Sequence, residues 1–144
     1  MMRVHGTCVA IAGRGVLLRA PSGAGKSDLA LRLIDAGARL VADDQVELAL
    51  DSGRLTARPP ATIAGLLEVR GLGIVTLDYQ SPVPLALVVD LRPAEAIERL
   101  PEEQTVDLLD RPVRCIAVDP RQASATAKIR LAIRLLPGMT GNPP

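Results

Sequence analysis

Residues 20–27, with the sequence Ala-Pro-Ser-Gly-Ala-Gly-Lys-Ser, match the phosphate-binding loop pattern, with alanine in place of its first glycine. The two glycines allow successive backbone N–H groups to turn inward and bind an anion, and a helix beginning near Lys26 adds unpaired amides. Lys26 could reach the β- and γ-phosphates of a nucleotide, and the Ser27 hydroxyl could bind Mg²⁺. A glycine-rich turn with a solvated lysine is the alternative, but Lys26 is one of only two lysines in the chain. The predicted nucleotide-binding residues are Ala20, Pro21, Ser22, Gly23, Ala24, Gly25, Lys26 and Ser27.

Two adjacent carboxylates, Asp43 and Asp44, follow the strand expected at 39–42. Strand ends beside a phosphate loop are where ligands bind in an open α/β sheet. One of the two carboxylates could bind the metal, and one could accept the proton of an attacking hydroxyl group. Because adjacent strand residues point to opposite faces, we expect only one of the pair to face the phosphates. The sequence leaves open which one, and an Asp-Asp turn with a capping role is the alternative.

Three further residues could belong to the same site. His5 is the single histidine and lies on the strand before the loop, where a structural role is the more common one. Glu68 and Arg70 flank Val69, so both should point to one face of an extended segment. A carboxylate for Mg²⁺ and a guanidinium for phosphate would suit a phosphate site, and a surface ion pair is the alternative.

The elements that must position these residues are short strands with helices between some of them. We expect strands at 4–12, 16–19, 39–42, 46–50, 55–58, 85–91 and 113–118, and helices at 28–36, 62–67, 95–99 and 121–136. The sequence therefore predicts an α/β fold, with a mixed central β-sheet flanked by helices in a single domain over 1–136. Residues 137–144 are rich in proline and glycine and are expected to form a mobile tail.

Composition limits the partners of this domain. The 144 residues are 48% hydrophobic and 23% charged, which is typical of a globular chain. Seventeen basic and sixteen acidic side chains leave a net charge of +1, so we expect no binding to nucleic acid or to an anionic membrane. No apolar run is long enough for a membrane span or a secretory signal, which favours the cytoplasm. Cys8 and Cys115 fit either one disulfide or two buried thiols.

Four segments together resemble a known family. Val4–Gly6, Ser22–Ser27, Leu40–Asp44 and the Glu-Val-Arg-Gly-Leu-Gly-Ile run at 68–74 are similar, in order, to the catalytic half of HPr kinase/phosphorylase. The run at 68–74 is highly specific to that family, whereas the phosphate loop is shared by many.

The resemblance implies a cytoplasmic enzyme that uses ATP and Mg²⁺ to phosphorylate a serine of the phosphocarrier protein HPr, and a hexameric assembly. In the family the same site can reverse the reaction with inorganic phosphate, which yields pyrophosphate. Carried over by position, the loop with Lys26 binds the phosphates and Asp44 exchanges the proton of the substrate serine. The resemblance also implies that Ser27, Asp43 and Glu68 bind Mg²⁺. It further implies that His5, Arg70 and Arg99 are catalytic residues.

Three departures from the family pattern are apparent, one of which is that the chain between Glu47 and Glu68 is shorter than in the full-length form. The match begins within four residues of Met1, so we expect a truncated form without the family's N-terminal domain. Residues 112–117 stand where the family has an arginine-bearing loop needed for dephosphorylation, and this favours kinase over phosphorylase activity. A phosphate-loop kinase or ATPase acting on a small metabolite is one alternative. A nucleotide-responsive regulatory module without turnover is another.

Overall fold

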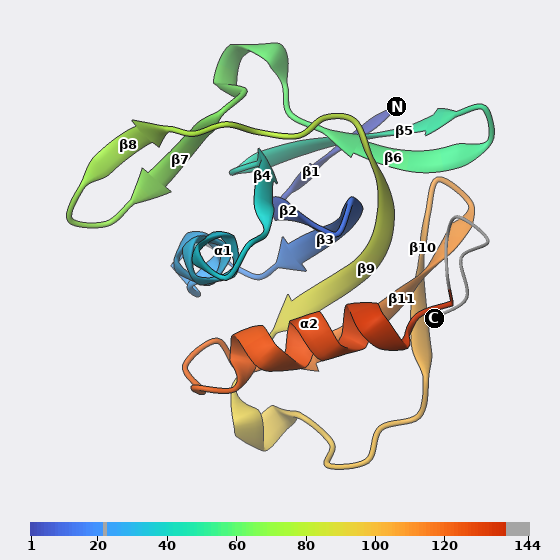
Figure 1. Ribbon diagram of the computed structural model, residues 1–144. Helices are drawn as coiled ribbons and strands as arrows, with labels where there is room; N and C mark the ends of the chain where they lie inside the picture. The colour runs from blue at the N-terminus through green and yellow to red at the C-terminus, as the bar shows by residue number, and fades with distance from the viewer. Residues whose placement is uncertain (22, 138–144) are drawn as a thin grey trace.

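The computed structural model describes residues 1–21 and 23–137 (Figure 1). In chain order the elements are β1 (Met2–His5), β2 (Thr7–Ile11), β3 (Arg14–Arg19), α1 (Lys26–Asp35), β4 (Arg39–Ala42), β5 (Gln45–Asp51), β6 (Arg54–Arg58), the 3-10 turn η1 (Ala61–Ile63), β7 (Leu66–Val69), β8 (Gly73–Thr76), β9 (Val83–Leu91), the 3-10 turn η2 (Ala94–Ala96), β10 (Gln104–Leu108), β11 (Arg111–Val118) and α2 (Ala125–Leu135). The tail expected over 137–144 lies outside the described residues except for Pro137. No described helix is long and apolar enough to span a bilayer.

The strands form one mixed, curled sheet and a separate hairpin. In the described part of the chain the sheet has nine strands in the order β1-β5-β6-β9-β3-β2-β4, and β10 pairs with β11, which itself pairs with β9. β9 runs parallel to β3 and β11 and antiparallel to β6. β7 and β8 pair only with each other and project away from the sheet (Figure 1). The mixed α/β sheet predicted from the sequence is confirmed.

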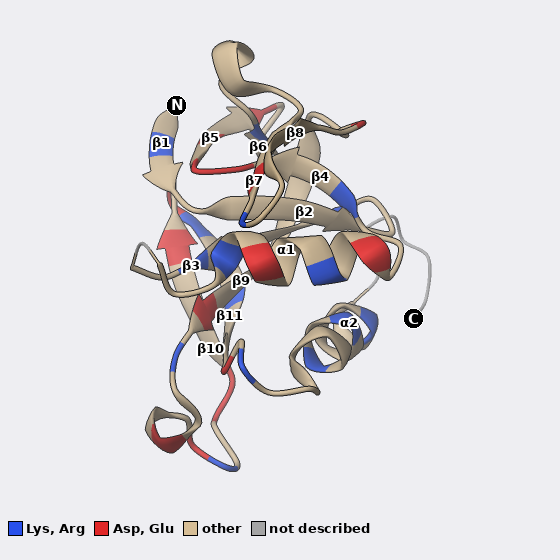
Figure 2. Ribbon diagram, turned by 90° about the vertical axis from the view of Figure 1, so that its left-hand side faces the viewer, with Lys and Arg blue, Asp and Glu red and all other residues tan. Residues whose placement is uncertain are grey.

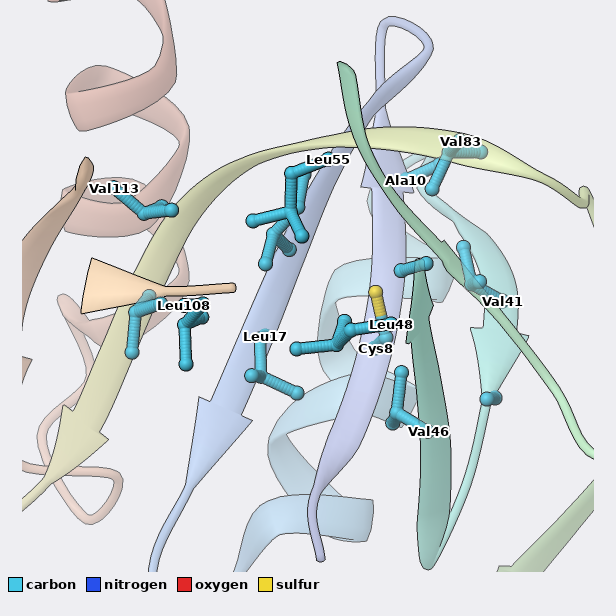
Figure 3. Close-up of a cluster of buried hydrophobic side chains, with 14 residues drawn as sticks. Cys8, Ala10, Leu17, Val41, Val46, Leu48, Leu55, Val83, Leu108 and Val113 are labelled. Atoms are coloured by element: carbon cyan, nitrogen blue, oxygen red, sulfur yellow. The ribbon is translucent and has the colours of Figure 1, made fainter. Parts of the chain in front are cut away.

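Apolar side chains fill both faces of this sheet. α1 and α2 cover one face, where Leu29 and Ile129 pack with residues of β2, β3, β9 and β11. On the other face the curl brings β5 and β6 over β2 and β3, and Cys8, Leu17 and Leu48 lie in the enclosed core (Figure 3). Full burial of a leucine contributes about 1.5–3 kcal/mol. The two cores therefore hold β3, and with it the start of the phosphate loop, in a fixed place.

The helix after the phosphate loop forms largely as the sequence predicts. It starts at Lys26, with Gly25 as its N-cap, and Leu29 N–H donates to the Gly25 carbonyl at 2.9 Å. It ends before Gly37, whose φ of 110° is the left-handed conformation common after a helix C-terminus. Leu29, Ala30 and Leu33 form its buried face.

Several predicted boundaries differ from the structure. The expected strand at 4–12 is two strands, because the chain turns at Gly6 and pairs first with β5 and then with β3 and β4. The helices expected at 62–67 and 95–99 are the 3-10 turns Ala61–Ile63 and Ala94–Ala96, and the last helix starts at Ala125 and not at 121.

The strand expected at 113–118 is confirmed as part of β11, so residues 112–117, which stand where the family has a loop, lie in a strand of the sheet. Residues 114–118 pair in parallel with β9, and residues 111–115 pair in antiparallel fashion with β10, so the backbone is hydrogen-bonded in the sheet. Residues 112–117 therefore form no counterpart of the family's arginine-bearing loop, and the preference for kinase over phosphorylase activity stays a prediction.

Candidate functional site

A cavity of about 580 Å³ opens at the start of α1. Figure 2 shows this helix with β7 above it and the segment leading to α2 below it. The cavity is lined by His5, Thr7, Gly23, Gly25, Lys26, Ser27, Asp28, Leu31, Asp43, Asp44, Glu68, Val69 and Arg70. Segments far apart in the sequence, from β1, the phosphate loop, the end of β4 and β7, thus meet in one place.

The phosphate loop supplies one wall of this cavity. Gly23 and Gly25 have φ values of 81° and 97°, which side chains rarely tolerate and which turn the backbone N–H groups of the loop. The Lys26 ammonium donates to the carbonyls of Ala20 at 2.9 Å and Pro21 at 3.2 Å, so it is folded over the loop. Only 7% of Lys26 is exposed. A phosphate group at this loop would therefore meet a positive charge that is close by and largely desolvated.

Asp43 is buried beside the loop and organises the three segments around it. Its Oδ1 accepts hydrogen bonds from the Thr7 hydroxyl at 2.8 Å and the Ser27 hydroxyl at 3.0 Å, and its Oδ2 accepts from the Glu68 backbone N–H at 3.2 Å. All three donors are uncharged. The carboxylate is 9% exposed and forms no ion pair with the described basic side chains. Its negative charge is thus hydrogen-bonded but not balanced, which is a favourable setting for a cation.

Asp44 has the opposite environment. Its φ of 71° places it in the left-handed region, which aspartate and asparagine tolerate better than most residues. Gly6 N–H donates to its carbonyl at 3.1 Å, while 69% of its side chain is exposed. His5 Nδ1 lies 3.6 Å from Asp44 Oδ1. The strand ends at Ala42, so the rule of alternating faces does not apply, and both Asp43 and Asp44 line the cavity.

Glu68 and Arg70 lie at the end of β7, on the far wall of the cavity. Both are exposed, whereas Val69 between them is buried against Leu40 and Leu67. The prediction that the two charged residues share one face agrees with this arrangement. The carboxylate of Glu68 and the guanidinium of Arg70 thus line the same cavity as the phosphate loop.

The donor set fits a magnesium nucleotide. Mg²⁺ prefers oxygen ligands, and protein sites usually provide one or two carboxylates beside phosphate oxygens and water. Ser27 Oγ and the Asp43 carboxylate are already 3.0 Å apart, and Glu68 lines the same cavity. Within residues 1–21 and 23–137, no three or more His, Cys, Asp or Glu side chains gather into a metal site.

Some predicted residues do not line this cavity, among them Ala20, Pro21 and Ala24 of the phosphate loop, and some lining residues were not predicted. Arg99 is exposed in the segment between η2 and β10 and does not line the cavity. Thr7 and Asp28 line it without having been predicted. A threonine within the apolar run Thr7–Ala10 was the available signal, since a buried hydroxyl needs a partner. Ser22 lies outside the described residues.

An ion pair between Arg19 and Asp90 joins the ends of β3 and β9 where the phosphate loop begins. Arg19, the last residue of β3, donates from Nε and Nη2 to Asp90 at 2.8 and 3.1 Å. Burial alone would raise the pKa of Asp90, but the hydrogen bonds and charge of Arg19 outweigh it and hold that pKa below its usual value. β3 and its parallel neighbour β9 are therefore held together where the phosphate loop begins.

The two cysteines are both free thiols. Burial raises the pKa of Cys8 to about 12. Burial also raises the pKa of Cys115, whose Sγ lies 3.4 Å from a carboxylate oxygen of Asp90. Of the two alternatives for the cysteines, the disulfide is therefore excluded, although Cys115 is only partly buried.

Comparison with known proteins places this site in a family. A family model described as HPr Serine kinase C-terminal domain matches residues 1–133. HPr kinase/phosphorylase of Clostridium tetani is 38% identical over 140 residues, covering 88% of this chain and 45% of the relative. The protein of the same name from Burkholderia lata is 40% identical over 126 residues, covering 80% of this chain and 39% of the relative. This chain thus spans less than half the length of these curated relatives.

A solved structure has the same fold. The Hpr(Ser) kinase/phosphatase from Coxiella burnetii superimposes with a TM-score of 0.80 at 24% sequence identity, covering 93% of this chain and 89% of the other. At that identity the likeness concerns the fold, and the family model carries the assignment. With the phosphate loop, the Asp43–Asp44 bend and the Glu68–Arg70 segment meeting in one cavity, the chain belongs to the HPr serine kinase C-terminal domain family.

Proposed function

We propose that this protein is an ATP- and Mg²⁺-dependent kinase that phosphorylates a serine of an HPr-type phosphocarrier protein. The observation that carries the proposal is the pairing, in one cavity, of a phosphate loop with the solvent-exposed carboxylate of Asp44. An exposed carboxylate can be reached by a hydroxyl group of another protein. The names of the relatives support HPr as the acceptor.

The residues divide into phosphate, metal and proton functions. The loop amides and Lys26 bind the nucleotide phosphates, and Arg70, which follows β7 and lines the same cavity, offers a further positive charge to them. Ser27, Asp43 and Glu68 would hold the Mg²⁺ ion, which when bound offsets the negative charge of the phosphates. The Thr7 hydroxyl fixes Asp43 in its orientation through the 2.8 Å bond.

Asp44 accepts the proton of the attacking serine hydroxyl. The serine oxygen forms a bond to the γ-phosphorus, the bond from that phosphorus to the β–γ bridging oxygen breaks, and ADP leaves. His5, 3.6 Å from Asp44, is placed to interact with its carboxylate during this transfer. For Arg99 the family resemblance is the only support, since this side chain lies outside the cavity.

The reverse reaction uses the same groups. An oxygen of inorganic phosphate attacks the phosphorus of phosphoserine, the bond to the serine oxygen breaks, and Asp44 returns the proton to that oxygen, so that pyrophosphate forms. We propose this phosphorolysis as a second activity of the cavity. A hexameric assembly and a cytoplasmic location are proposed from the family resemblance alone.

The test incubates the protein with Mg-ATP and a panel of HPr-type carrier proteins, followed by mass mapping of the modified residue. We expect phosphoserine on the carrier. Asp44→Asn should lower the rate by about 10²- to 10⁴-fold, which is the range for loss of a positioned general base. Asparagine tolerates the left-handed backbone at this position, so the loss reports chemistry and not strain.

Asp107→Asn, an exposed aspartate on β10, is the matched control and should keep the wild-type rate. Nucleotide binding without transfer to any carrier would contradict the proposed function. Transfer to a small metabolite, or no turnover over hours, would point to the two alternatives raised by the sequence. A second incubation of the phosphorylated carrier with inorganic phosphate tests the reverse reaction.

A further inference from the structure

A second cavity, of about 550 Å³, lies on the other side of the phosphate loop. Gly23, Gly25 and Asp28 line both cavities, so the loop is the wall between them. The second cavity is also lined by Arg32 of α1, by the end of β9 and the segment after it from Leu91 to Glu95, and by the loop between β11 and α2. A ligand whose phosphates bind the loop could therefore extend into this second cavity.

The loop between β11 and α2 is held against the phosphate loop. A Cβ atom added to Gly25 would lie 3.6 Å from Pro120, so the two loops are close neighbours. Arg32 of α1 donates from Nη2 to the Pro120 carbonyl and also pairs with Asp28 at 3.2 Å. The second cavity is thus built on the same helix that begins the phosphate site.

Arg121 presents a fixed guanidinium group to this cavity. Asp119 is 3% exposed and accepts hydrogen bonds from Nε and Nη2 of Arg121 at 3.2 and 3.0 Å, and from its backbone N–H at 2.9 Å. Hydrogen bonds from the Arg121 side chain hold the pKa of Asp119 well below its usual range, so the pair stays charged at neutral pH. The Arg121 side chain is nevertheless 72% exposed, so its planar group is oriented and open to a ligand.

The chain offers few other flat surfaces to a base. It has no Phe or Trp, and its single Tyr79 lines neither cavity but packs beside Gly65. A nucleotide base can stack on a guanidinium plane as well as on an aromatic ring. Three guanidinium groups line the second cavity, those of Arg32, Arg92 and Arg121. Arg121 is the most exposed of the three and is held in place by Asp119, so it is the best placed for such stacking.

We propose that the second cavity binds the nucleoside half of the nucleotide, with the base stacked on the Arg121 guanidinium. The inference rests on the proposed function, because it takes the phosphates to lie on the phosphate loop. Every base has a π-face, so stacking of this kind discriminates weakly between adenine and guanine.

The test compares two ligands that share their phosphates, Mg-ADP and magnesium pyrophosphate, by isothermal titration calorimetry. For Arg121→Ala we expect affinity for Mg-ADP to fall about 5- to 20-fold, in line with the loss of one stacking contact. Affinity for pyrophosphate should change less than about twofold. Arg121→Lys keeps the charge but not the plane, so it should resemble the alanine variant. Arg130→Ala, an exposed arginine on α2, should match the wild type.

The outcomes separate the two proposals. If wild-type protein binds neither ligand, the phosphate site fails and the nucleoside site with it. If both ligands bind and Arg121→Ala weakens them equally, or weakens neither, the nucleoside site alone is overturned. Full rescue by Arg121→Lys would show that Arg121 acts as a point charge, which also overturns stacking. Retained pyrophosphate binding by the variants shows that their phosphate loop is still folded.

Discussion

Asp43 and Asp119 are both buried beside the phosphate loop, one at each cavity, yet their surroundings differ in charge. Asp43 accepts hydrogen bonds only from the uncharged donors of Thr7, Ser27 and Glu68. Asp119 accepts two bonds from the Arg121 guanidinium, in addition to the backbone N–H groups of Ala94 and Arg121.

The difference separates a functional carboxylate from a structural one. A buried charge is costly unless it is paired, and Asp119 meets that requirement within the protein. Asp43 has hydrogen bonds but no cationic partner among the described residues, so its charge is available to a ligand cation. We infer that the unbalanced carboxylate is the one suited to Mg²⁺, while the balanced one fixes the loop that carries Arg121.

The largest effect on folding is expected for Asp119→Asn. The Asp119 carboxylate orients Arg121, and it also joins the β11–α2 loop to η2 by accepting a hydrogen bond from the Ala94 N–H. The substitution removes the negative charge on which both contacts depend. We expect a clear loss of stability, larger than that of any single change around Asp43, with the melting temperature measured by calorimetry. An unchanged melting temperature would show that the pair is not structural. Asp107→Asn on the exposed strand β10 serves as the control.

Thr7→Val should lower the stability by a smaller amount than Asp119→Asn, and its effect should be confined to the surroundings of Asp43. Valine keeps the shape of a fully buried residue but loses the hydroxyl donor to Asp43. Loss of a hydrogen bond to a charged group costs about 1.5–3 kcal/mol, and denaturant unfolding measures it. Because the lost bond also orients the proposed metal ligand, Mg²⁺-dependent activity should fall as well. Wild-type activity together with wild-type stability would remove Thr7 from the site.

Lowering the pH should reduce the stability that the Asp119–Arg121 ion pair gives to the folded protein. The pKa of Asp119 lies below its usual value in the folded protein, mainly because of its Arg121 hydrogen bonds. The stability that this pair provides is therefore complete above the unfolded pKa of about 3.9 and is lost as the pH falls further. Urea unfolding of wild type and Asp119→Asn at pH 6 and pH 3 should give a difference that narrows in acid. A difference that widens at pH 3 would reverse the sign of this linkage.

The elements around Asp43 could be predicted from the sequence much better than those around Asp119. The phosphate loop, α1, the strand at 39–42 and the carboxylates after it follow from local patterns of glycine, lysine and apolar residues. Which way Asp43 and Asp44 point did not follow, because the strand stops at Ala42 and Asp44 takes a left-handed backbone.

The Asp119 side depends on pairing between distant segments. The strand at 113–118 was predicted from the sequence, but its pairing with β9 on one side and β10 on the other was not, because nothing local reveals those partners. β10 itself is short and mostly exposed, so it lacks the apolar run that predicts a strand. The second cavity then arises only when the chain brings Pro120 close to Gly25, although the two residues are almost a hundred positions apart.

The most direct test of the comparison is the Mg²⁺ dependence of carrier phosphorylation in Asp43→Asn and Asp119→Asn. We predict that Asp43→Asn raises the Mg²⁺ concentration needed for half-maximal rate by at least about tenfold, since one anionic ligand is lost. Asp119→Asn should leave that concentration within about twofold of the wild type, even though the protein is less stable. An unchanged Mg²⁺ requirement in Asp43→Asn, or a shift confined to Asp119→Asn, would contradict the assignment of Asp43 as the unbalanced, metal-binding carboxylate.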